Sequence, residues 1–357
     1  MPDREVTSIT PGKDRVDPVT HMLAGACIAR AALNRMTGRA TLTVILAAAA
    51  PDLDVLARLK GPVPGFVHDR GFTHSFVGVA LVSASVVCFI YLIWRLGGCK
   101  GKDLHPTPPW WLLFGFAYLA GLSHILLDFT DNYGVRPYWP FSDRWYSWDI
   151  VYLADPVVTV LLVGGLLLSV LASLMNEELG RASKTPHGRL GAAMALIGVV
   201  AVWGVRDHEH RRALHTLDTR QYEGPGPVHA AAFPLWWNPY LWTGMVETAR
   251  SVKAMRVDSR SQNVDPQVEE LVRYKPEETP VTLAAKSSSL GRAYMNWARF
   301  PITETEPLES GGRGYLVRFK DSRFELAGRR EDYSPWAIVR LNRDLSVADM
   351  TFGDLPQ

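Results

Sequence analysis

Apolar residues in this 357-residue chain gather into blocks over its first 205 residues, with polar loops between the blocks. A helix that crosses a bilayer needs about 20 predominantly apolar residues. Four blocks are long enough and nearly free of charge: 73–96, 110–128, 151–175 and 189–205. Buried core helices of water-soluble proteins, the alternative, are seldom this long and uncharged. The pattern therefore predicts a polytopic bundle of membrane helices.

Two earlier blocks, 19–36 and 40–57, are shorter than a typical span. Pro51 and Asp52 interrupt the second of them. These blocks predict either a short tilted hairpin or a pair of partly re-entrant segments.

The pattern changes from Arg206 onward, where charged residues, Pro and Gly become frequent. Short runs of aromatic and β-branched residues alternate with polar ones, which is typical of antiparallel strands. These runs are 241–248, 251–258, 314–320, 336–341 and 345–352. The region 265–300 between them has helical character. We expect a mainly α protein with a polar tail (1–16), a membrane helical domain (17–205) and a soluble, β-rich α+β domain (206–357).

Composition narrows the class of protein. The formal net charge is only +2, so nothing in it favours nucleic acid as a partner. The three cysteines, Cys27, Cys88 and Cys99, form no CxxC pair and predict no disulfide framework. The first 17 residues lack the apolar core of a cleavable signal peptide. The bilayer is the expected partner, and the pattern favours no particular oligomeric state.

Loop charge predicts the orientation of the bundle. The short loops near residues 30–39, 95–102 and 181–189 are basic, whereas 52–72 and 129–150 carry mixed charge and many aromatic residues. Alternating spans place the basic loops on one side, which is the cytoplasm by the positive-inside rule. We expect a multi-pass protein of the cytoplasmic membrane.

Histidine and aspartate recur at the ends of the apolar blocks. Imidazole and carboxylate groups are ligands for zinc, manganese or iron, and ionisable groups beside a membrane usually mark a function. The predicted topology places all of them on the non-cytoplasmic face: His21, Asp52, Asp54, His68, His74, His124 and Asp128.

The pair His124 and Asp128 has the most informative spacing. Residues four apart on a helix lie on one face, one turn apart, so both side chains can bind one metal ion. Asp52 and Asp54 are two apart and would point to opposite sides of an extended turn. One of them would then bind metal while the other orients a histidine or caps a helix.

The segment 68–75 holds the densest group of polar residues. We expect Thr73 or one of its neighbours to cap the long helix that follows, with His74 in the first turn of that helix. We assign His68 and His74 as ligand or general base. Arg70 is the nearby group able to bind a phosphate or carboxylate in a bidentate manner, so we assign it as a substrate anchor.

Weaker candidates complete the set. His21 is a single histidine on an apolar helix, and Asp149 and Asp155 are second-rank ligands. The residues from His208 to His215 predict a solvated charged collar in preference to a second metal site.

Several of these motifs resemble the bacterial YdjM-like family of membrane-bound, predicted metal-dependent hydrolases. The likeness covers about residues 17–205 and rests on ThrHisMetLeuAlaGly, ProAspLeuAsp, HisAspArgGlyPheThrHisSer, SerHisIleLeuLeuAsp and TyrTrpProPheSer. It implies a location in the bacterial inner membrane. AsnProTyrLeuTrp and ArgPheProIle resemble the C-terminal extension of longer members.

The order of the polar residues is also distantly similar to zinc phospholipase C and P1-type nucleases. That likeness implies metal ligands at His21, Asp54, His74 (or His68), His124 and Asp128. The chain departs from it after Asp128, where the helical His-x-x-x-Glu of those enzymes has no counterpart. A full trinuclear site is therefore not expected.

Together these patterns favour a membrane-bound, metal-dependent hydrolase with one or two divalent ions, zinc first and manganese or iron as alternatives. Asp52 or Asp54 would act as general base or orienting group, and the substrate would be a phosphoester such as a lipid head group. The rival hypotheses are a transporter, with ionisable residues near the bilayer midplane, and a sensor whose ligands saturate the metal.

Overall fold

The computed structural model describes residues 18–34, 36–37, 39–96, 109–153, 155–178, 189–222, 226–235, 238–265, 270–308, 314–324 and 335–353. The N-terminal tail and the loops 97–108 and 179–188, with their basic residues, lie outside these ranges.

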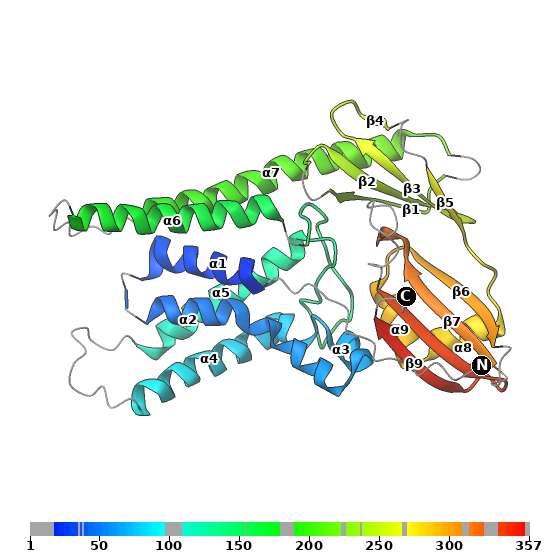
Figure 1. Ribbon diagram of the computed structural model, residues 1–357, viewed down its shortest axis with the longest axis horizontal. Helices are drawn as coiled ribbons and strands as arrows, with labels where there is room; N and C mark the ends of the chain where they lie inside the picture. The colour runs from blue at the N-terminus through cyan, green and yellow to red at the C-terminus, as the bar shows by residue number, and fades with distance from the viewer. Residues whose placement is uncertain are drawn as a thin grey trace, which may run out of the picture.

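The N-terminal half is a bundle of helices that run roughly side by side (Figure 1). Its first five elements are α1 (Pro18–Ile28), the π-helical turn η1 (Ala29–Leu33), α2 (Ala40–Ala49), the 3₁₀ helix η2 (Ala50–Lys60) and α3 (Pro62–His68). The next five are the 3₁₀ turn η3 (Phe72–His74), α4 (Phe76–Leu96), α5 (Trp110–Thr130), α6 (Pro156–Glu178) and α7 (Arg189–Thr219).

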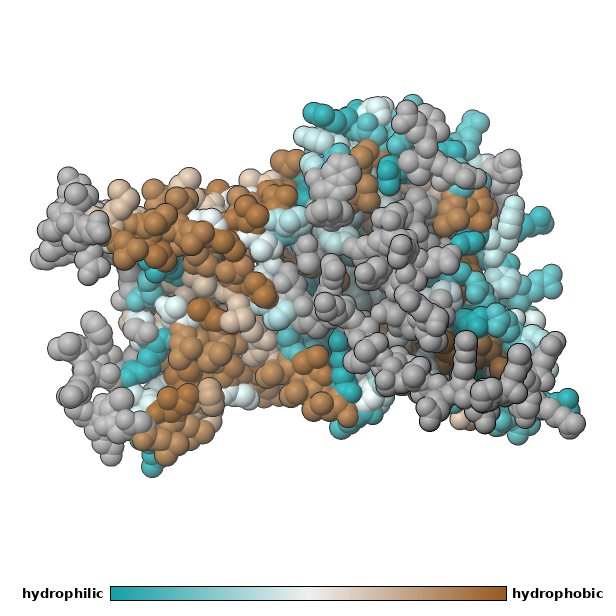
Figure 2. Space-filling view, in the orientation of Figure 1, coloured by the Kyte–Doolittle hydropathy of each residue, from teal (hydrophilic) through white to brown (hydrophobic). Residues whose placement is uncertain are grey.

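Among the described residues, five helical segments are long and apolar enough to cross a membrane: Ala40–Lys60, Phe76–Leu96, Trp110–Thr130, Pro156–Met175 and Arg189–Thr219. The four expected spans are thus confirmed. Of the two shorter blocks, the second also forms a segment long enough to cross, while the first, Pro18–Leu33, is a shorter apolar helix. Large apolar side chains remain exposed along these helices, among them Leu81, Val160 and Ile197. On the face that Figure 2 shows, brown residues cover much of the bundle, which is the kind of surface that lipid covers.

The C-terminal half contains two antiparallel sheets. In the first, β2 (Leu241–Glu247) and β3 (Ser251–Asp258) form the centre, with β1 (His229–Pro234), β4 (Asn263–Val264) and β5 (Leu271–Tyr274) beside them. The second is a meander of β6 (Pro301–Leu308), β7 (Gly314–Asp321), β8 (Trp336–Asn342) and β9 (Val347–Gly353). Helices α8 (Pro280–Ser287) and α9 (Ser289–Trp297) pack against the second sheet. The β-rich domain is therefore confirmed, with β1, β4, β5 and β6 beyond the strands that alternation predicted. The helical character expected over 265–300 is confirmed for α8 and α9 but is wrong for β5.

The expected domain boundary at Arg206 falls inside a helix, because α7 continues to Thr219 and carries the chain from the bundle to the first sheet (Figure 1). The expected solvated collar is wrong for Glu209 and His210, which are buried. Glu209 accepts a hydrogen bond from Ser259 Oγ at 2.6 Å. The polar face of α7 therefore packs against the sheet, while His208 and His215 are exposed.

The bundle and the second sheet share a hydrophobic core. Phe66 of α3 stacks on Phe352 with ring centroids 4.1 Å apart and meets the edge of Trp297 at 5.6 Å. Tyr133, from the loop after α5, lies 5.0 Å from the Trp297 ring. The end of the bundle that carries His124 and Asp128 is thus built partly from C-terminal residues.

Candidate metal centre

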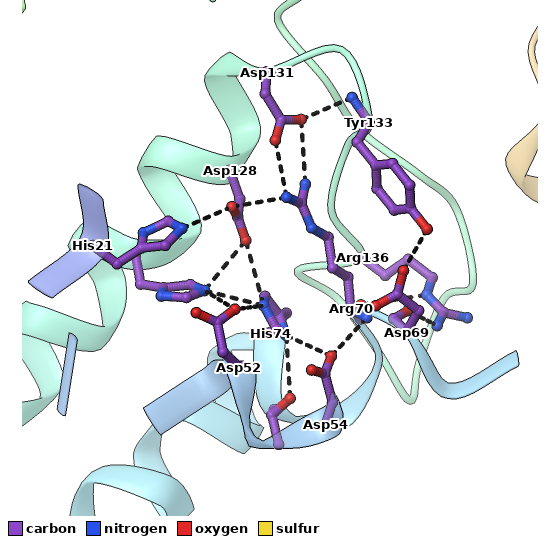
Figure 3. Close-up of polar contacts among 12 residues, drawn as sticks. His21, Asp52, Asp54, Asp69, Arg70, His74, Asp128, Asp131, Tyr133 and Arg136 are labelled. Carbon is purple, nitrogen blue, oxygen red and sulfur yellow. Dashed lines mark hydrogen bonds and ion pairs between the residues drawn. The ribbon is translucent and has the colours of Figure 1, made fainter. Parts of the chain in front are cut away.

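The structure brings five of the predicted residues together at one end of the bundle (Figure 3). Four elements supply them: His21 from α1, Asp52 from η2, His74 from η3, and His124 with Asp128 from α5. Among the described residues, two sets of groups have donor atoms close enough to hold a metal ion, and both lie here: His74, His124 and Asp128, and His21, Asp52 and His124. The expected one-sided arrangement is therefore present.

His74, His124 and Asp128 form a compact triangle of donor atoms. The two Nε2 atoms are 3.0 Å apart, and Asp128 Oδ2 lies 3.4 Å from His74 Nε2 and 3.3 Å from His124 Nε2. Ligands of tetrahedral zinc at 2.0–2.1 Å are separated by about 3.3–3.4 Å. The triangle thus has the dimensions of one face of such a site, with a fourth position left for another ligand.

Hydrogen bonds fix which nitrogen of each histidine faces this triangle. His124 Nδ1 lies 2.7 Å from the carbonyl oxygen of Ala48, which only accepts, so Nδ1 must donate. His74 Nδ1 faces Asp54 Oδ2 at 3.2 Å, and a carboxylate likewise accepts. Two Nε2 atoms then face each other inside the protein, and a cation between them, either a proton or a metal ion, is needed to offset the repulsion of their lone pairs.

Charge around His74 favours such a cation. Burial lowers the pKa of His74, but the carboxylates of Asp52, Asp54 and Asp128 outweigh it and raise that pKa to about 10. The buried Asp128 Oδ2 atom has no hydrogen-bond partner among the described residues. The donor set therefore fits a divalent metal: two imidazoles with their outer nitrogens occupied, and a carboxylate oxygen that is otherwise unsatisfied.

Asp52 and Asp54 point to different sides, as the sequence predicts, but Asp54, the ligand that the likeness to zinc phospholipase C implies, belongs to neither candidate metal group. Asp52 Oδ1 lies 3.7 Å from His74 Nε2 and 3.6 Å from His124 Nε2, beside the triangle. Asp54 contacts the outer nitrogen of His74 and accepts a hydrogen bond from the Arg70 backbone N–H at 2.8 Å. Asp52 is therefore positioned as ligand or base, and Asp54 as the group that orients His74.

The local helix type explains why these carboxylates diverge. Pro51 opens a 3₁₀ helix in place of the extended turn expected there. With three residues per turn, successive side chains are about 120° apart, so Asp52 and Asp54 project from different faces. His74 belongs to a separate short turn before α4, and the residue that caps α4 is Ser75, whose Oγ accepts from Gly78 N–H at 3.0 Å. A neighbour of Thr73 therefore caps α4, as expected, but the expectation that His74 lies in the first turn of that helix is wrong.

His21 completes the cluster from the opposite side. Its ring stacks on His124 with centroids 3.7 Å apart, and its Nε2 lies 3.3 Å from Asp128 Oδ1. The buried Nδ1 atom of His21 has no hydrogen-bond partner among the described residues. His21 therefore contacts Asp128 at Oδ1, the carboxylate oxygen that faces away from the triangle, and helps to orient this side chain.

The assignment of Arg70 as a substrate anchor is wrong in this structure. Its guanidinium makes a bidentate pair with Asp131 at 2.9 and 3.2 Å, contacts Asp128 Oδ1 at 3.0 Å and donates to Gly134 O at 2.9 Å. Burial lowers the pKa of Arg70, but the charges of Asp128 and Asp131 raise it above its ordinary value. These contacts use the donors that a phosphate would need, so Arg70 positions Asp128.

Sequence reasoning missed the residues that support Arg70. Asp131 accepts from the backbone N–H groups of Tyr133 and Gly134, forming the turn that ends α5. Tyr133 places its ring under the Arg70 guanidinium and donates its hydroxyl to Asp69. The turn sequence Asp131 to Gly134 carries a signal for this, because Asp and Gly favour such turns.

Three predicted residues lie apart from the cluster. His68 ends α3 with an exposed side chain and belongs to neither candidate metal group, so the structure does not support it as ligand or base. Asp155 caps α6 and pairs with Arg206 at 2.8 Å. Asp149 pairs with Arg299. The sequence does not distinguish these three residues from the residues of the cluster, because each has a similar place at the end of an apolar block.

These features define a multi-pass membrane protein with a buried His/Asp cluster at one end of its bundle. The chain belongs to the YdjM inner membrane protein family, whose model matches residues 16–216. It is also similar to the uncharacterized protein YfhP of Bacillus subtilis (strain 168), with 24% identity over 340 residues, or 93% of each chain. No solved structure matches. The likeness to YfhP extends well beyond residue 216 and so includes the β-rich half.

Proposed function

We propose that this protein is a membrane-bound hydrolase that uses one divalent metal ion, zinc in the first instance, held by His74, His124 and Asp128. The observation that carries the proposal is the convergence of two imidazole Nε2 atoms and a carboxylate oxygen within 3.0–3.4 Å of one another. Three protein ligands with a free fourth position are typical of catalytic zinc, whereas structural zinc is usually closed by four. The donor set therefore favours an enzyme over a saturated sensor.

A metal ion in such a site supplies a Lewis acid that polarises the bond to be cleaved and lowers the pKa of water to near neutrality. The chain's own residues supply the rest. Asp52 lies beside both Nε2 atoms, and its Oδ2 atom is buried without a hydrogen-bond partner among the described residues. Asp52 is therefore placed to hold a proton taken from the attacking water.

The position of the cluster supports a substrate that lies at the membrane surface. His74 precedes α4, Asp128 is near the end of α5, and Asp52 follows α2, so all three are at the same end of the bundle. A phosphoester of a lipid head group meets this condition. A transporter would instead place its ionisable residues near the bilayer midplane, halfway along these helices.

Metal analysis of the purified protein tests the proposal. Wild type should carry about one divalent ion per chain, and His124→Ala and Asp128→Asn should lose it. His68→Ala is the matched control, because this histidine is close to His74 in the sequence but is exposed and lies outside the cluster. Wild type without a stoichiometric ion, or equal loss in His68→Ala, contradicts the metal site.

A panel of soluble and lipid phosphoesters then tests hydrolysis. A metal-loaded protein that cleaves none of them refutes the enzymatic part of the proposal.

A further inference from the structure

The 3₁₀ helix η2 has an apolar face that no other described element covers. Its three leucines are spaced three residues apart, at positions 53, 56 and 59. Side chains at this spacing eclipse one another in a 3₁₀ helix, so the leucines form a single stripe. Leu53, Leu56 and Leu59 are 55%, 56% and 84% exposed. Three aligned and exposed leucines on so short a helix indicate a surface that is covered in the membrane-bound protein.

The other faces of η2 point into the protein. Asp52 and Asp54 have side-chain exposures of 14% and 9% and contact His74. Arg58 lies against α3, since a Cβ atom on Gly65 would come within 2.6 Å of the Arg58 side chain. One helix thus presents carboxylates to the candidate metal centre and leucines outward.

The leucine stripe adjoins the surface that lipid already covers. Helix α2 leads directly into η2, and Figure 2 shows the brown surface of the bundle continuing to the region that Figure 1 labels α3, the helix that follows η2. Exposed aromatic rings lie at the same end of α4, where Phe76 packs edge-to-face on Tyr138 and Phe72 on Trp139. Such rings are enriched at the level of the lipid head groups.

Length and charge place the end of η2 at the edge of the bilayer. Helix α2 covers about 15 Å and η2 about 22 Å, so together they are longer than the roughly 30 Å of a bilayer core, and the segment ends outside that core. Four charged residues lie in η2: Asp52, Asp54, Arg58 and Lys60. The exposed Lys60 ends the stripe, where a lysine head can reach the phosphate level. An amphipathic helix of this kind belongs at the membrane interface.

We propose that the stripe of Leu53, Leu56 and Leu59 inserts into the acyl-chain boundary of the leaflet that adjoins the metal centre. The opposite faces of the same helix then hold Asp52 and Asp54 directly beside that leaflet. A lipid whose head group carries the scissile phosphoester reaches the cluster from the bilayer, and this last step rests on the proposed function.

Nitroxide labels in lipid nanodiscs test the insertion without relying on activity. Leu56→Cys is labelled in a chain whose native cysteines are replaced, and collisions with oxygen, which concentrates in lipid, are compared with collisions with a water-soluble nickel chelate. Leu283→Cys is the matched control, because Leu283 is 51% exposed on α8 of the β-rich half. A separate variant that keeps Cys88, exposed on α4, as its single cysteine is labelled there and gives the lipid reference.

Leu56 should resemble Cys88, with oxygen collisions dominant, while Leu283 should favour the nickel chelate. A Leu56 label that behaves like Leu283 overturns the proposal, and so does one shielded from both reagents, which would indicate a protein partner or a second copy.

Activity measurements test the delivery of lipid. Leu56→Glu should lower hydrolysis of a phospholipid in vesicles about tenfold, because a carboxylate replaces a side chain buried in the leaflet. Hydrolysis of a short soluble phosphodiester should be unchanged. Equal effects on both substrates refute delivery from the leaflet. If wild type cleaves neither substrate, the proposed function fails, while the label result still decides whether the helix inserts.

Discussion

Asp54 holds the nitrogen of His74 that faces away from the candidate metal, and this contact decides which nitrogen is available as a ligand. Asp54 Oδ2 lies 3.2 Å from His74 Nδ1, and the Thr73 hydroxyl lies 3.1 Å from the same atom. A carboxylate in this position orients the imidazole and raises its basicity as a ligand. In the proposed metal centre, the carboxylate of Asp54 would therefore act on the metal through His74.

Replacing Asp54 by Asn tests this role at the scale of one residue. The amide oxygen can still accept the hydrogen bonds, but the negative charge is lost, so metal affinity should fall about 10- to 100-fold. Competition with a chelator of known affinity measures the change. Thr73→Val should have a smaller effect, because a neutral hydroxyl is a weaker partner than a carboxylate. Unchanged affinity in Asp54→Asn would show that the contact is incidental.

Single residues also show which contacts the sequence predicts and which it does not. The spacing of His124 and Asp128 predicts their common face, because the period of a helix alone determines it. No spacing reveals that Arg70 pairs with Asp131, 61 positions away. Arg70 does bind an anion in a bidentate manner, as its chemistry predicts, but that anion is the carboxylate of Asp131.

At the scale of elements, the short turn η3 must pass close to α4 to deliver His74. A Cβ atom on Gly78 would lie only 1.6 Å from the carbonyl oxygen of Phe72. That carbonyl also accepts hydrogen bonds from the backbone and side chain of Ser75. The glycine therefore allows the approach that fixes the turn and its histidine.

Gly78→Ala should push η3 away from α4 and displace His74. We expect at least about a tenfold loss of metal affinity, as for the loss of a well-oriented ligand, with helical content retained. Gly115→Ala on α5 is the matched control, since no atom outside its own helix backbone and chain neighbours lies within 4 Å of the added Cβ. Metal content and circular dichroism of both variants check this. Equal metal affinity in the two would refute the role of the close approach.

Element boundaries were predictable where apolar content alone sets them, as for α4 and α5. They were not predictable where packing decides. Helix α7 runs past the apolar block that ends at residue 205, and there Arg206 pairs with Asp155 and Glu209 accepts a hydrogen bond from Ser259. The segment after Pro51 forms a 3₁₀ helix that packs against α3 and η3, where the sequence predicts an extended turn. Sequence therefore predicts which residues gather, but not how each is oriented.

At the scale of the whole molecule, the β-rich half supports the candidate metal centre. Arg323 donates from Nη1 to the carbonyl oxygen of Asn132 at 2.7 Å, and its guanidinium lies over the Trp297 ring. Asn132 follows Asp131, whose carboxylate holds Arg70 against Asp128. A chain of contacts thus leads from Arg323, just after β7, to Asp128, the carboxylate of the candidate metal centre.

Removing this support without leaving a buried charge requires a double substitution, because Arg323 also pairs with the fully buried Asp321 at 2.8 Å. Breaking only one side of such a pair is strongly destabilising. Asp321→Asn combined with Arg323→Gln should keep the sheet folded and loosen the loop at Asn132, which weakens metal binding about tenfold. Glu306→Gln with Arg318→Gln removes an exposed pair on the neighbouring strands and should leave metal affinity unchanged. Chelator competition separates the two double variants. If both retain the affinity of wild type, the β-rich half has no part in shaping the site, and the reason for its attachment to the bundle must lie in another surface.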